Sequence, residues 1–425
     1  MTDAVGVGFL GCGTVGSAVL RLLDEHAEDI AARSGCRFEV RRVAVHEPSR
    51  RRDDVPVPAD RFTSDPEEVV KDPEVAVIVE VMGGIDPARE LVLSALSSGK
   101  RVVTANKELL ATHGPELFEA AATGGAGLHF EATVAGGVPL IRPLIESLTG
   151  ERITRLLGIV NGTTNYVLTR MTDEGVAYEE ALAEAQRLGY AEADPTDDVE
   201  GFDAAAKCAI LASLAFDTRV VVGDVYREGI TRVSAEDIEF ARRLGYVVKL
   251  LAVAELEDGD VAVRVHPAMI PVDHPLAAVR DAFNAVFLDG PRIGELMFYG
   301  RGAGGDPTAT AVVGDIVHIM REMEATHVAA PPAVERRRAI RPMERMEGQY
   351  YLCLAVADRP GVLASVAGAF ADNLVSIKSV WQEGTGEEAL LVLITHRANE
   401  GSMQRTVTQL RGLDTVKEVR SVMRV

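Results

Sequence analysis

Apolar runs alternate with stretches of helical periodicity along the first third of the chain. The predicted strands cover residues 5–10, 38–45, 75–81, 101–104 and 128–132, and the predicted helices between them include residues 17–30 and 87–97. Nearly continuous apolar strands separated by helices are typical of a parallel sheet that is covered on both faces. The pattern therefore predicts a doubly wound α/β domain over residues 1–132.

The rest of the chain predicts two further domains. Residues 133–325 combine longer helices with strands of mixed polarity, which indicates an α+β domain, while residues 300–325 are expected to complete the first domain. Residues 326–348 have many Pro and Arg and poor periodicity, so they predict a linker. Residues 349–425 predict a βαββαβ unit with elements at 350–357, 362–372, 375–382, 389–395, 401–411 and 416–424.

Composition narrows the classes of function. The 425 residues carry 64 acidic and 44 basic side chains, a net charge of −20. Such a field repels phosphate backbones and anionic lipids, so we expect neither nucleic-acid nor membrane binding. No apolar run is long enough to cross a bilayer, and the N-terminus lacks a signal-peptide pattern. The four cysteines are too few for a disulfide scaffold, and we expect a reduced, cytoplasmic protein.

A glycine-rich motif, Gly11-Cys12-Gly13-Thr14-Val15-Gly16, follows the first predicted strand and opens the first helix. In such a turn the first glycine permits the tight bend, the second lets the backbone approach a pyrophosphate, and the third lets the helix pack on the sheet. N–H groups at the start of the helix then face the anion. The motif predicts a Rossmann-type NAD(P) site formed by Gly11, Gly13, Thr14, Val15 and Gly16. A glycine turn that binds no ligand is the alternative.

The segment after the second predicted strand bears on which nicotinamide cofactor is used. A free ribose 2′-hydroxyl usually meets an Asp or Glu at the end of this strand, where this chain has Val45 and His46. Arginines follow at 50, 51 and 52, and guanidinium groups bind phosphate oxygens in pairs. Arg50 and Arg51 therefore favour NADP. Glu47 leaves NAD open, and a solvated charged loop is the alternative.

Lysines close to carboxylates mark two further places. Thr104-Ala105-Asn106-Lys107 directly follows a predicted strand, where ligands of a parallel sheet are found, so Lys107 is a candidate to reach the nicotinamide or the substrate. Asp203 and Lys207 lie four residues apart in a helix predicted at 199–216, and therefore on one face. Lys107 as a surface residue, and Asp203–Lys207 as an exposed ion pair, are the alternatives. The loop before this helix carries the acids Glu192, Asp194, Asp197 and Asp198, which suit a substrate ammonium group.

Together these segments make residues 1–325 resemble homoserine dehydrogenase. The resemblance is carried, in order, by the motifs GFLGCGTVG, TANKELLA, FEATVAGGVPLI, GIVNGTTNYVLTRM, GYAEADPTDDVEGFDAAAK and YGRGAGGDPTATAVVGDI. The tail from Tyr350 to Val425, with Asp358-Arg359-Pro360-Gly361 before its first helix, resembles an ACT domain, a module that commonly binds an amino acid.

The resemblance implies interconversion of L-homoserine and L-aspartate 4-semialdehyde with NADP or NAD. It implies that Lys207 transfers the proton, with Asp203 beside it, and that Lys107 lies at the nicotinamide end. It also implies that residues 133–325 form the catalytic, substrate-binding and dimerisation domain, in which Glu192, Asp198 and Tyr190 bind the substrate. The implied cofactor-binding residues, besides those of the first glycine motif, are Arg50, Arg51, Thr104, Lys107, Gly304 and Gly305.

Three further expectations follow from the resemblance. Glu131, Val134, Gly136 and Val138 match a site for a sodium-like monovalent cation formed by one carboxylate and backbone carbonyls, with a plain glycine turn as the alternative. Threonine is the expected effector of the ACT unit, and a homodimer or homotetramer is the expected assembly. Two other functions stay open: a different NAD(P)-dependent oxidoreductase of small amino acids, and a non-enzymatic amino-acid sensor of the ACT type.

Overall fold

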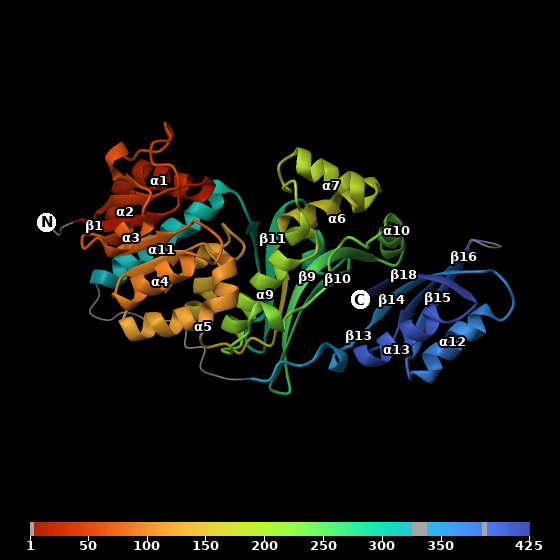
Figure 1. Ribbon diagram of the computed structural model, residues 1–425. Helices are drawn as coiled ribbons and strands as arrows, with labels where there is room; N and C mark the ends of the chain where they lie inside the picture. The colour runs from red at the N-terminus through yellow and green to blue at the C-terminus, as the bar shows by residue number, and fades with distance from the viewer. Residues whose placement is uncertain (1–3, 325–337, 385–388) are drawn as a thin grey trace. The chain divides into compact units, whose positions relative to one another are not determined.

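The computed structural model describes residues 4–324, 338–384 and 389–425 (Figure 1). The chain divides into two compact units, each built from three segments. The first unit contains Met1–Leu156, Ala206–Asp224 and Phe283–Arg338, and the second contains Leu157–Ala205, Val225–Ala282 and Ala339–Val425. Most of the predicted linker, up to residue 337, lies outside the described residues.

A six-stranded parallel sheet forms the centre of the first unit, with the strand order β3-β2-β1-β4-β5-β6. The strands are β1 Val5–Leu10, β2 Phe38–Ala44, β3 Phe62–Thr63, β4 Val77–Glu80, β5 Arg101–Thr104 and β6 Leu128–His129. The order runs outward from β1 in both directions, which confirms the predicted doubly wound sheet. Val7 and Phe9 of β1 are completely buried, as a central strand requires.

Helices cover this sheet, and one of them comes from late in the sequence. They are α1 Thr14–Glu25, α2 Ala27–Ser34, α3 Pro66–Lys71, α4 Ala88–Ser97, α5 Lys107–Gly124 and α11 Gly305–Glu324. Figure 1 shows the cyan α11 among the red and orange helices. Val312 and Ile316 of α11 belong to the same hydrophobic core as Val7 and Phe9, so residues near 310 stabilise a sheet that begins at residue 5. The predicted helix at 17–30 is instead two helices that meet at His26.

The first unit also contains irregular elements and a hairpin. These are the short helices η1 Ala59–Arg61, η2 Glu131–Thr133, η3 Pro143–Ser147 and η4 Val222–Asp224, and the antiparallel strands β11 Phe283–Gly290 and β12 Gly294–Arg301. The strand predicted at 128–132 ends at His129, because the chain turns into η2 and buries the carboxylate of Glu131.

The second unit is built on a mixed sheet with the order β7-β9-β10-β18-β14-β16-β15, and β8 also pairs with β10. Its strands are β7 Arg155–Ile159, β8 Tyr226–Arg227, β9 Tyr246–Glu257, β10 Asp260–Pro271, β14 Tyr350–Val356, β15 Ile377–Glu383, β16 Ala389–Thr395 and β18 Val416–Arg424, with the small pair β13 Glu347–Gly348 and β17 Ala398–Asn399. Its helices are α6 Gly162–Glu174, α7 Tyr178–Arg187, α8 Thr196–Val199, α10 Ala235–Arg243, η5 Pro275–Ala278, η6 Met343–Arg345, α12 Val362–Asp372 and α13 Glu400–Arg411.

The predicted βαββαβ order of the tail is confirmed by β14, α12, β15, β16, α13 and β18. The tail is nevertheless not separate from the rest of the second unit, because β18 pairs in parallel with β10 at Arg424 and Ala268. The helix predicted at 199–216 is wrong in its start. The structure has α8 and then α9 Phe202–Ala215, because Gly201 adopts a positive φ of 79° between them, a conformation that suits glycine.

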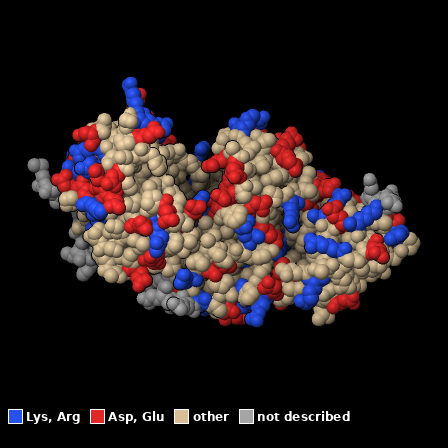
Figure 2. Space-filling model, viewed as in Figure 1, with Lys and Arg blue, Asp and Glu red and all other residues tan. Residues whose placement is uncertain are grey.

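Three properties of the described part of the chain bear on the expected exclusions. Among the described residues, no helix is both long and apolar enough to span a membrane. Figure 2 shows acidic and basic side chains interspersed over the visible face, where the described residues form no continuous basic area. None of the cysteines at 12, 36, 208 and 353, all of which are described, forms a disulfide.

Candidate active site

The first glycine loop of the first unit has the geometry that its three glycines predict. Gly11 has a φ of 105°, and a side chain at Gly16 would bring its Cβ to 2.7 Å from the carbonyl oxygen of Gly11. A Cβ at Gly13 would meet no atom within 4 Å. The main chain is therefore tightly packed at Gly11 and Gly16, whereas there is open space beside Gly13, the residue before α1 starts at Thr14. This opening fits a pyrophosphate that approaches the main chain at a helix N-terminus.

The second glycine loop lies against the first. Gly304 has a φ of 118°, and Gly305 begins α11. A Cβ at Gly305 would lie 3.3 Å from Cγ2 of Thr14, so the N-termini of α1 and α11 approach each other. The structure thus brings together two predicted loops that are far apart in the sequence.

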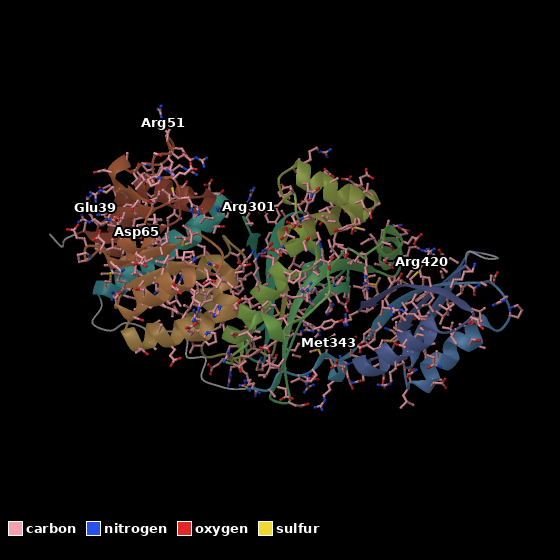
Figure 3. The ribbon with its side chains drawn as sticks, viewed as in Figure 1. Glu39, Arg51, Asp65, Arg301, Met343 and Arg420 are labelled. Atoms are coloured by element: carbon pink, nitrogen blue, oxygen red, sulfur yellow. The ribbon has the colours of Figure 1, made fainter. Side chains whose placement is uncertain are left out.

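The three arginines after β2 have different environments. Arg52 donates hydrogen bonds to the carbonyl oxygens of Glu47 and Arg50, and its guanidinium lies 5.0 Å from the ring centroid of Phe62. Arg50 and Arg51 are exposed. Figure 3 shows the side chain of Arg51 extending away from its unit, where it pairs with Asp53. Arg52 therefore shapes the loop, and the other two arginines face solvent.

Lys107 and Lys207 line one cavity of about 280 Å³ within the first unit. Its wall also includes Gly83 and Gly84, which follow β4, and Gly302, which precedes α11. Because Lys107 follows β5, the cavity lies at the carboxyl ends of two neighbouring parallel strands, where ligands of such sheets bind. Both lysines are partly buried. The cavity wall thus carries two lysine side chains, with the acidic Glu108 next to Lys107.

Asn106 fixes the start of the helix that carries Lys107. Its Oδ1 accepts the N–H of Leu109 at 3.0 Å, and its Nδ2 donates to the carbonyl oxygen of Gly84 at 2.6 Å. Thr104 is completely buried, and its hydroxyl donates to the Glu80 carboxylate and accepts the Asn106 N–H. Burial raises the pKa of Glu80. Thr104 does not line the cavity itself. It fixes the position of Asn106, and the residues that follow Thr104 form part of the cavity wall.

In the second unit, Asn161 brings together two of the predicted acids. Its Nδ2 donates to Oδ1 of Asp198 at 2.6 Å and to Oδ2 of Asp203 at 2.8 Å. Asp203 is buried, with 5% of its surface exposed, and Asp198 is half-buried. Asp203 is the second residue of α9, and Lys207 follows it by one turn of the same helix.

The loop that carries Tyr190 and Glu192 packs on α6. The ring of Tyr190 lies 4.8 Å from the ring of Tyr166, and Thr163 Oγ1 donates to the carbonyl oxygen of Tyr190 at 2.7 Å. Gln186 donates to the carbonyl oxygen of Glu192 at 3.0 Å, which leaves the Glu192 side chain exposed. Side chains of α6 and α7 thus fix the main chain of this loop, while the carboxylate of Glu192 is exposed.

The carboxylate of Glu131, a residue of the expected cation site, is buried and bonded to the main chain. That carboxylate, 1% exposed, accepts N–H bonds from Leu140, Ile141 and Arg142. Ala135 and Gly136 follow with φ values of 55° and 47°. Among the described residues there is no group of three or more His, Cys, Asp or Glu side chains that could hold a metal ion. The Glu131 carboxylate is therefore held in place by the main chain that follows it, and the monovalent-cation site of Glu131, Val134, Gly136 and Val138 stays a prediction.

Three site residues escaped the sequence analysis: Glu80, Asn106 and Asn161. Glu80 had a signal, because it is a charged residue inside an apolar strand. Asn106 and Asn161 each precede a helix, the position where Asn caps the N-terminus. Their second bonds, to Gly84 and to the two aspartates, depend on long-range contacts.

The first unit has glycine loops at two helix N-termini and a lysine-lined cavity beyond the ends of its strands. This arrangement is typical of a nicotinamide-dependent dehydrogenase. Family models match residues 11–131 as the NAD-binding domain of homoserine dehydrogenase, residues 139–317 as homoserine dehydrogenase and residues 352–415 as an ACT domain. The chain belongs to the homoserine dehydrogenase family. It is an oxidoreductase that interconverts L-homoserine and L-aspartate 4-semialdehyde, a step of threonine and methionine biosynthesis.

Relatives match over nearly the whole chain. The homoserine dehydrogenase of Mycobacterium tuberculosis is 49% identical over 99% of this chain and 97% of its own length. That of Corynebacterium glutamicum is 46% identical over 100% and 96%. The crystal structure of a homoserine dehydrogenase from Thiobacillus denitrificans is 42% identical, with a TM-score of 0.92 over 100% of this chain and 98% of its own. A hyperthermophilic archaeal homoserine dehydrogenase, solved in complex with NADPH, is 29% identical, with a TM-score of 0.63 over 76% and 99%.

Proposed function

We propose that the chain reduces L-aspartate 4-semialdehyde to L-homoserine with NADPH as the preferred cofactor and Lys207 as the proton donor. The observation that carries this proposal is the cavity that Lys107 and Lys207 line together in the unit that also holds both glycine loops. A reduced nicotinamide supplies a hydride to the aldehyde carbon when it is bound. The substrate oxygen then gains negative charge and needs a proton.

The two lysines have separate roles in this step. Lys207 gives a proton from its ammonium group to the substrate oxygen, which completes the alcohol. Lys107 keeps its proton and stabilises the negative charge while it develops. Asp203, one turn before Lys207 on α9, orients the helix start and adds a counter-charge. Oxidation of homoserine reverses the proton transfer.

The acidic residues of the second unit bind the amino-acid part of the substrate. Glu192, whose side chain is exposed above a fixed main chain, accepts the substrate ammonium group. Asp198 and Tyr190 complete the substrate-binding set. Carboxylates suit this task because a charged acceptor forms the stronger kind of hydrogen bond with an ammonium donor.

The cofactor is held by the first glycine loop, by Gly304 and Gly305, and by the arginines after β2. Gly11, Gly13, Thr14, Val15 and Gly16 cradle the pyrophosphate, and Thr104 supports this end of the site through Asn106. Arg50 and Arg51 bind the ribose 2′-phosphate from their exposed positions after β2, and Arg51 exchanges its pair with Asp53 for the phosphate. The complex of the archaeal homoserine dehydrogenase with NADPH supports this choice of cofactor.

A sodium-like cation is proposed at the turn after β6. Glu131 and the main-chain carbonyl oxygens of Val134, Gly136 and Val138 would hold it, and the left-handed residues Ala135 and Gly136 give the turn its tight curvature. The ion would stiffen a turn whose Gly136 lines the lysine cavity. Activity in sodium chloride above that in choline chloride at equal ionic strength is the expected result.

Regulation and assembly complete the proposal. Threonine is proposed to bind the ACT unit near the loop from Asp358 to Gly361 and Asn373, and the chain is proposed to form a homodimer or homotetramer. One spectrophotometric assay tests the whole: aspartate semialdehyde is supplied with NADPH or NADH, with and without threonine. NADPH oxidation that depends on the semialdehyde, faster than NADH oxidation and reduced by threonine, is expected. No turnover of this substrate with either cofactor would refute the proposal.

A further inference from the structure

One amide side chain in the second unit connects the two aspartates on which the proposed function depends. Asn161 donates from Nδ2 to Asp198 at 2.6 Å and to Asp203 at 2.8 Å. Its Oδ1 accepts the N–H of Thr164 at 2.8 Å and the hydroxyl of the same residue at 2.9 Å. An amide nitrogen has two hydrogens, so both are used on the carboxylates.

The orientation of this amide follows from its surroundings. Only an oxygen can accept the N–H of Thr164, so Oδ1 must face the start of α6 and Nδ2 must face the acids. Asn161 is 4% exposed, which keeps water from replacing these bonds. The side chain therefore joins the start of α6 to α8 through Asp198 and to α9 through Asp203.

The two carboxylates need such a donor between them. Asp198 and Asp203 carry like charges and accept bonds from a single nitrogen, and their repulsion is strong where water is excluded. The turn at Gly201, whose N–H donates to the carbonyl oxygen of Asp198 at 3.0 Å, places both acids on the same side of the chain. A neutral amide with two N–H groups satisfies both without adding charge.

We infer that Asn161 is the positioning residue of this site: its Nδ2 sets the separation and orientation of the Asp198 and Asp203 carboxylates. This inference rests on the roles proposed above for the two aspartates. Without Asn161, the Asp198 carboxylate would no longer be oriented for the substrate. The Asp203 carboxylate would no longer be fixed one turn before Lys207. Both the KM for the semialdehyde and kcat depend on Asn161 in this scheme, whereas the KM for NADPH does not.

The test must separate this role from that of a helix cap, because Asn161 also caps α6. Asn161→Ser and Asn161→Asp both keep an N-cap oxygen, since Ser, Asp and Asn are similar caps. Neither keeps two N–H donors. We expect kcat/KM for the semialdehyde to fall roughly 10- to 100-fold in both, the size that a misplaced active-site group produces. The melting temperature is expected to fall as well, because the carboxylates lose their donor, whereas the KM for NADPH stays unchanged.

A matched control is available at another helix. Asn399 caps α13 by accepting the N–H of Gly401 at 3.1 Å. Asn399→Ser makes the same chemical change at a cap outside the proposed site, and kcat/KM is expected to stay within twofold. If Asn161→Ser and Asn161→Asp also stay within twofold, Asn161 is only a cap and the inference is overturned.

A double-mutant cycle tests whether Asn161 acts through an aspartate. Asp203→Asn alone and Asp203→Asn with Asn161→Ser are expected to give similar kcat values, because the second change removes a bond to a group already altered. Fully additive losses would overturn the inference while leaving the proposed function intact. If Asp198→Asn and Asp203→Asn both retain full kcat/KM, the proposed roles of the acids fail, and the inference fails with them.

Discussion

Lys107 and Lys207 line the same cavity although they belong to different helices, α5 and α9. Lys107 is the first residue of α5 and follows Asn106, whose side chain donates to the carbonyl oxygen of Gly84. Lys207 lies in the middle of α9. The two lysines therefore enter the cavity from different positions in their helices, one at the start of α5 and one in the middle of α9. We assign the mobile proton to Lys207 and the fixed charge to Lys107.

Lys207→Ala is expected to lower kcat by about 10²- to 10⁴-fold, the usual contribution of a positioned acid or base. The dissociation constant of NADPH, measured by fluorescence titration, should change little. A matched control is Lys71→Ala, because Lys71 pairs with Glu67 at the same four-residue spacing on the exposed face of α3. Retention of more than a tenth of the original kcat by the Lys207 variant would show that another group supplies the proton.

Replacing Arg50 and Arg51 together with Ala should weaken NADPH use by tenfold or more and leave NADH use nearly unchanged. The reason is that a charge-assisted bond to phosphate contributes about 1.5–3 kcal/mol, and NADH lacks the 2′-phosphate. The ratio of kcat/KM for the two cofactors is the measurement. Arg37→Ala, an exposed arginine before β2, is the control. Equal losses with both cofactors would exclude recognition of the 2′-phosphate by these arginines.

Local patterns predicted most of the fold, and long-range bonds account for what they missed. The strands β1 and β5, the helix α12 and the order of the tail follow directly from apolar periodicity. The helix at 199–216 was wrong in its start because a single glycine, Gly201, interrupts a favourable pattern. The bond from Asn161 to Asp203, the second residue of the shortened helix, spans 42 residues of sequence, so no local pattern could show it.

Positions in the candidate site could be predicted where a short motif determines the local backbone conformation. The glycine loop at Gly11 and the lysine after β5 needed only one strand and one helix to be placed. Glu131 was named, but the direction of its carboxylate depends on three amides at residues 140–142, which no local pattern shows. Residues that position other side chains through long-range hydrogen bonds, such as Asn161, are therefore the ones that the sequence does not predict.

Asp315 gives a prediction about pH. Burial raises its pKa to about 6; His129 and Arg142 oppose the shift, and the Glu131 carboxylate adds to it. An unfolded aspartate titrates near pH 3.9, so between about pH 4 and 6 the folded chain binds more protons here than the unfolded chain. The contribution of Asp315 to the free energy of unfolding therefore decreases as pH rises through this window and is constant above it.

Asp315→Asn should remove this dependence, because an amide oxygen can still accept the N–H of Glu131, which Asp315 accepts at 2.9 Å. The melting temperature of the variant relative to the original chain should rise from pH 4 to pH 6 and then level off. Asp306→Asn, at an exposed position of α11, should show no such trend. A difference between Asp315→Asn and the original chain that is the same at every pH would contradict the assignment.

The last prediction concerns removal of the tail, for which the linker-like sequence suggested a separable regulatory unit. The structure gives a reason to expect otherwise. Tyr351 and Ser421 both donate to Asp237, which is 2% exposed, and Arg424 lies between Glu228 and Glu400 with bonds of 3.1 and 2.9 Å. A chain ending at Met343 would keep Asp237 and Glu228 and lose these partners, together with the strand that pairs with β10. Leaving a buried polar group unsatisfied costs about 1–3 kcal/mol.

Truncation after Met343 is therefore expected to lower the melting temperature and kcat as well as to abolish the response to threonine. The full chain with Asp358→Ala separates the two effects, since it alters the proposed effector loop and leaves the bonds to Asp237 and Glu228 in place. It should keep its melting temperature and basal kcat and lose only the response. Thermal melts and initial rates with and without threonine measure both. A truncated chain with unchanged stability and kcat would show that the bonds of Tyr351, Ser421 and Arg424 contribute little, and that the tail is separable after all.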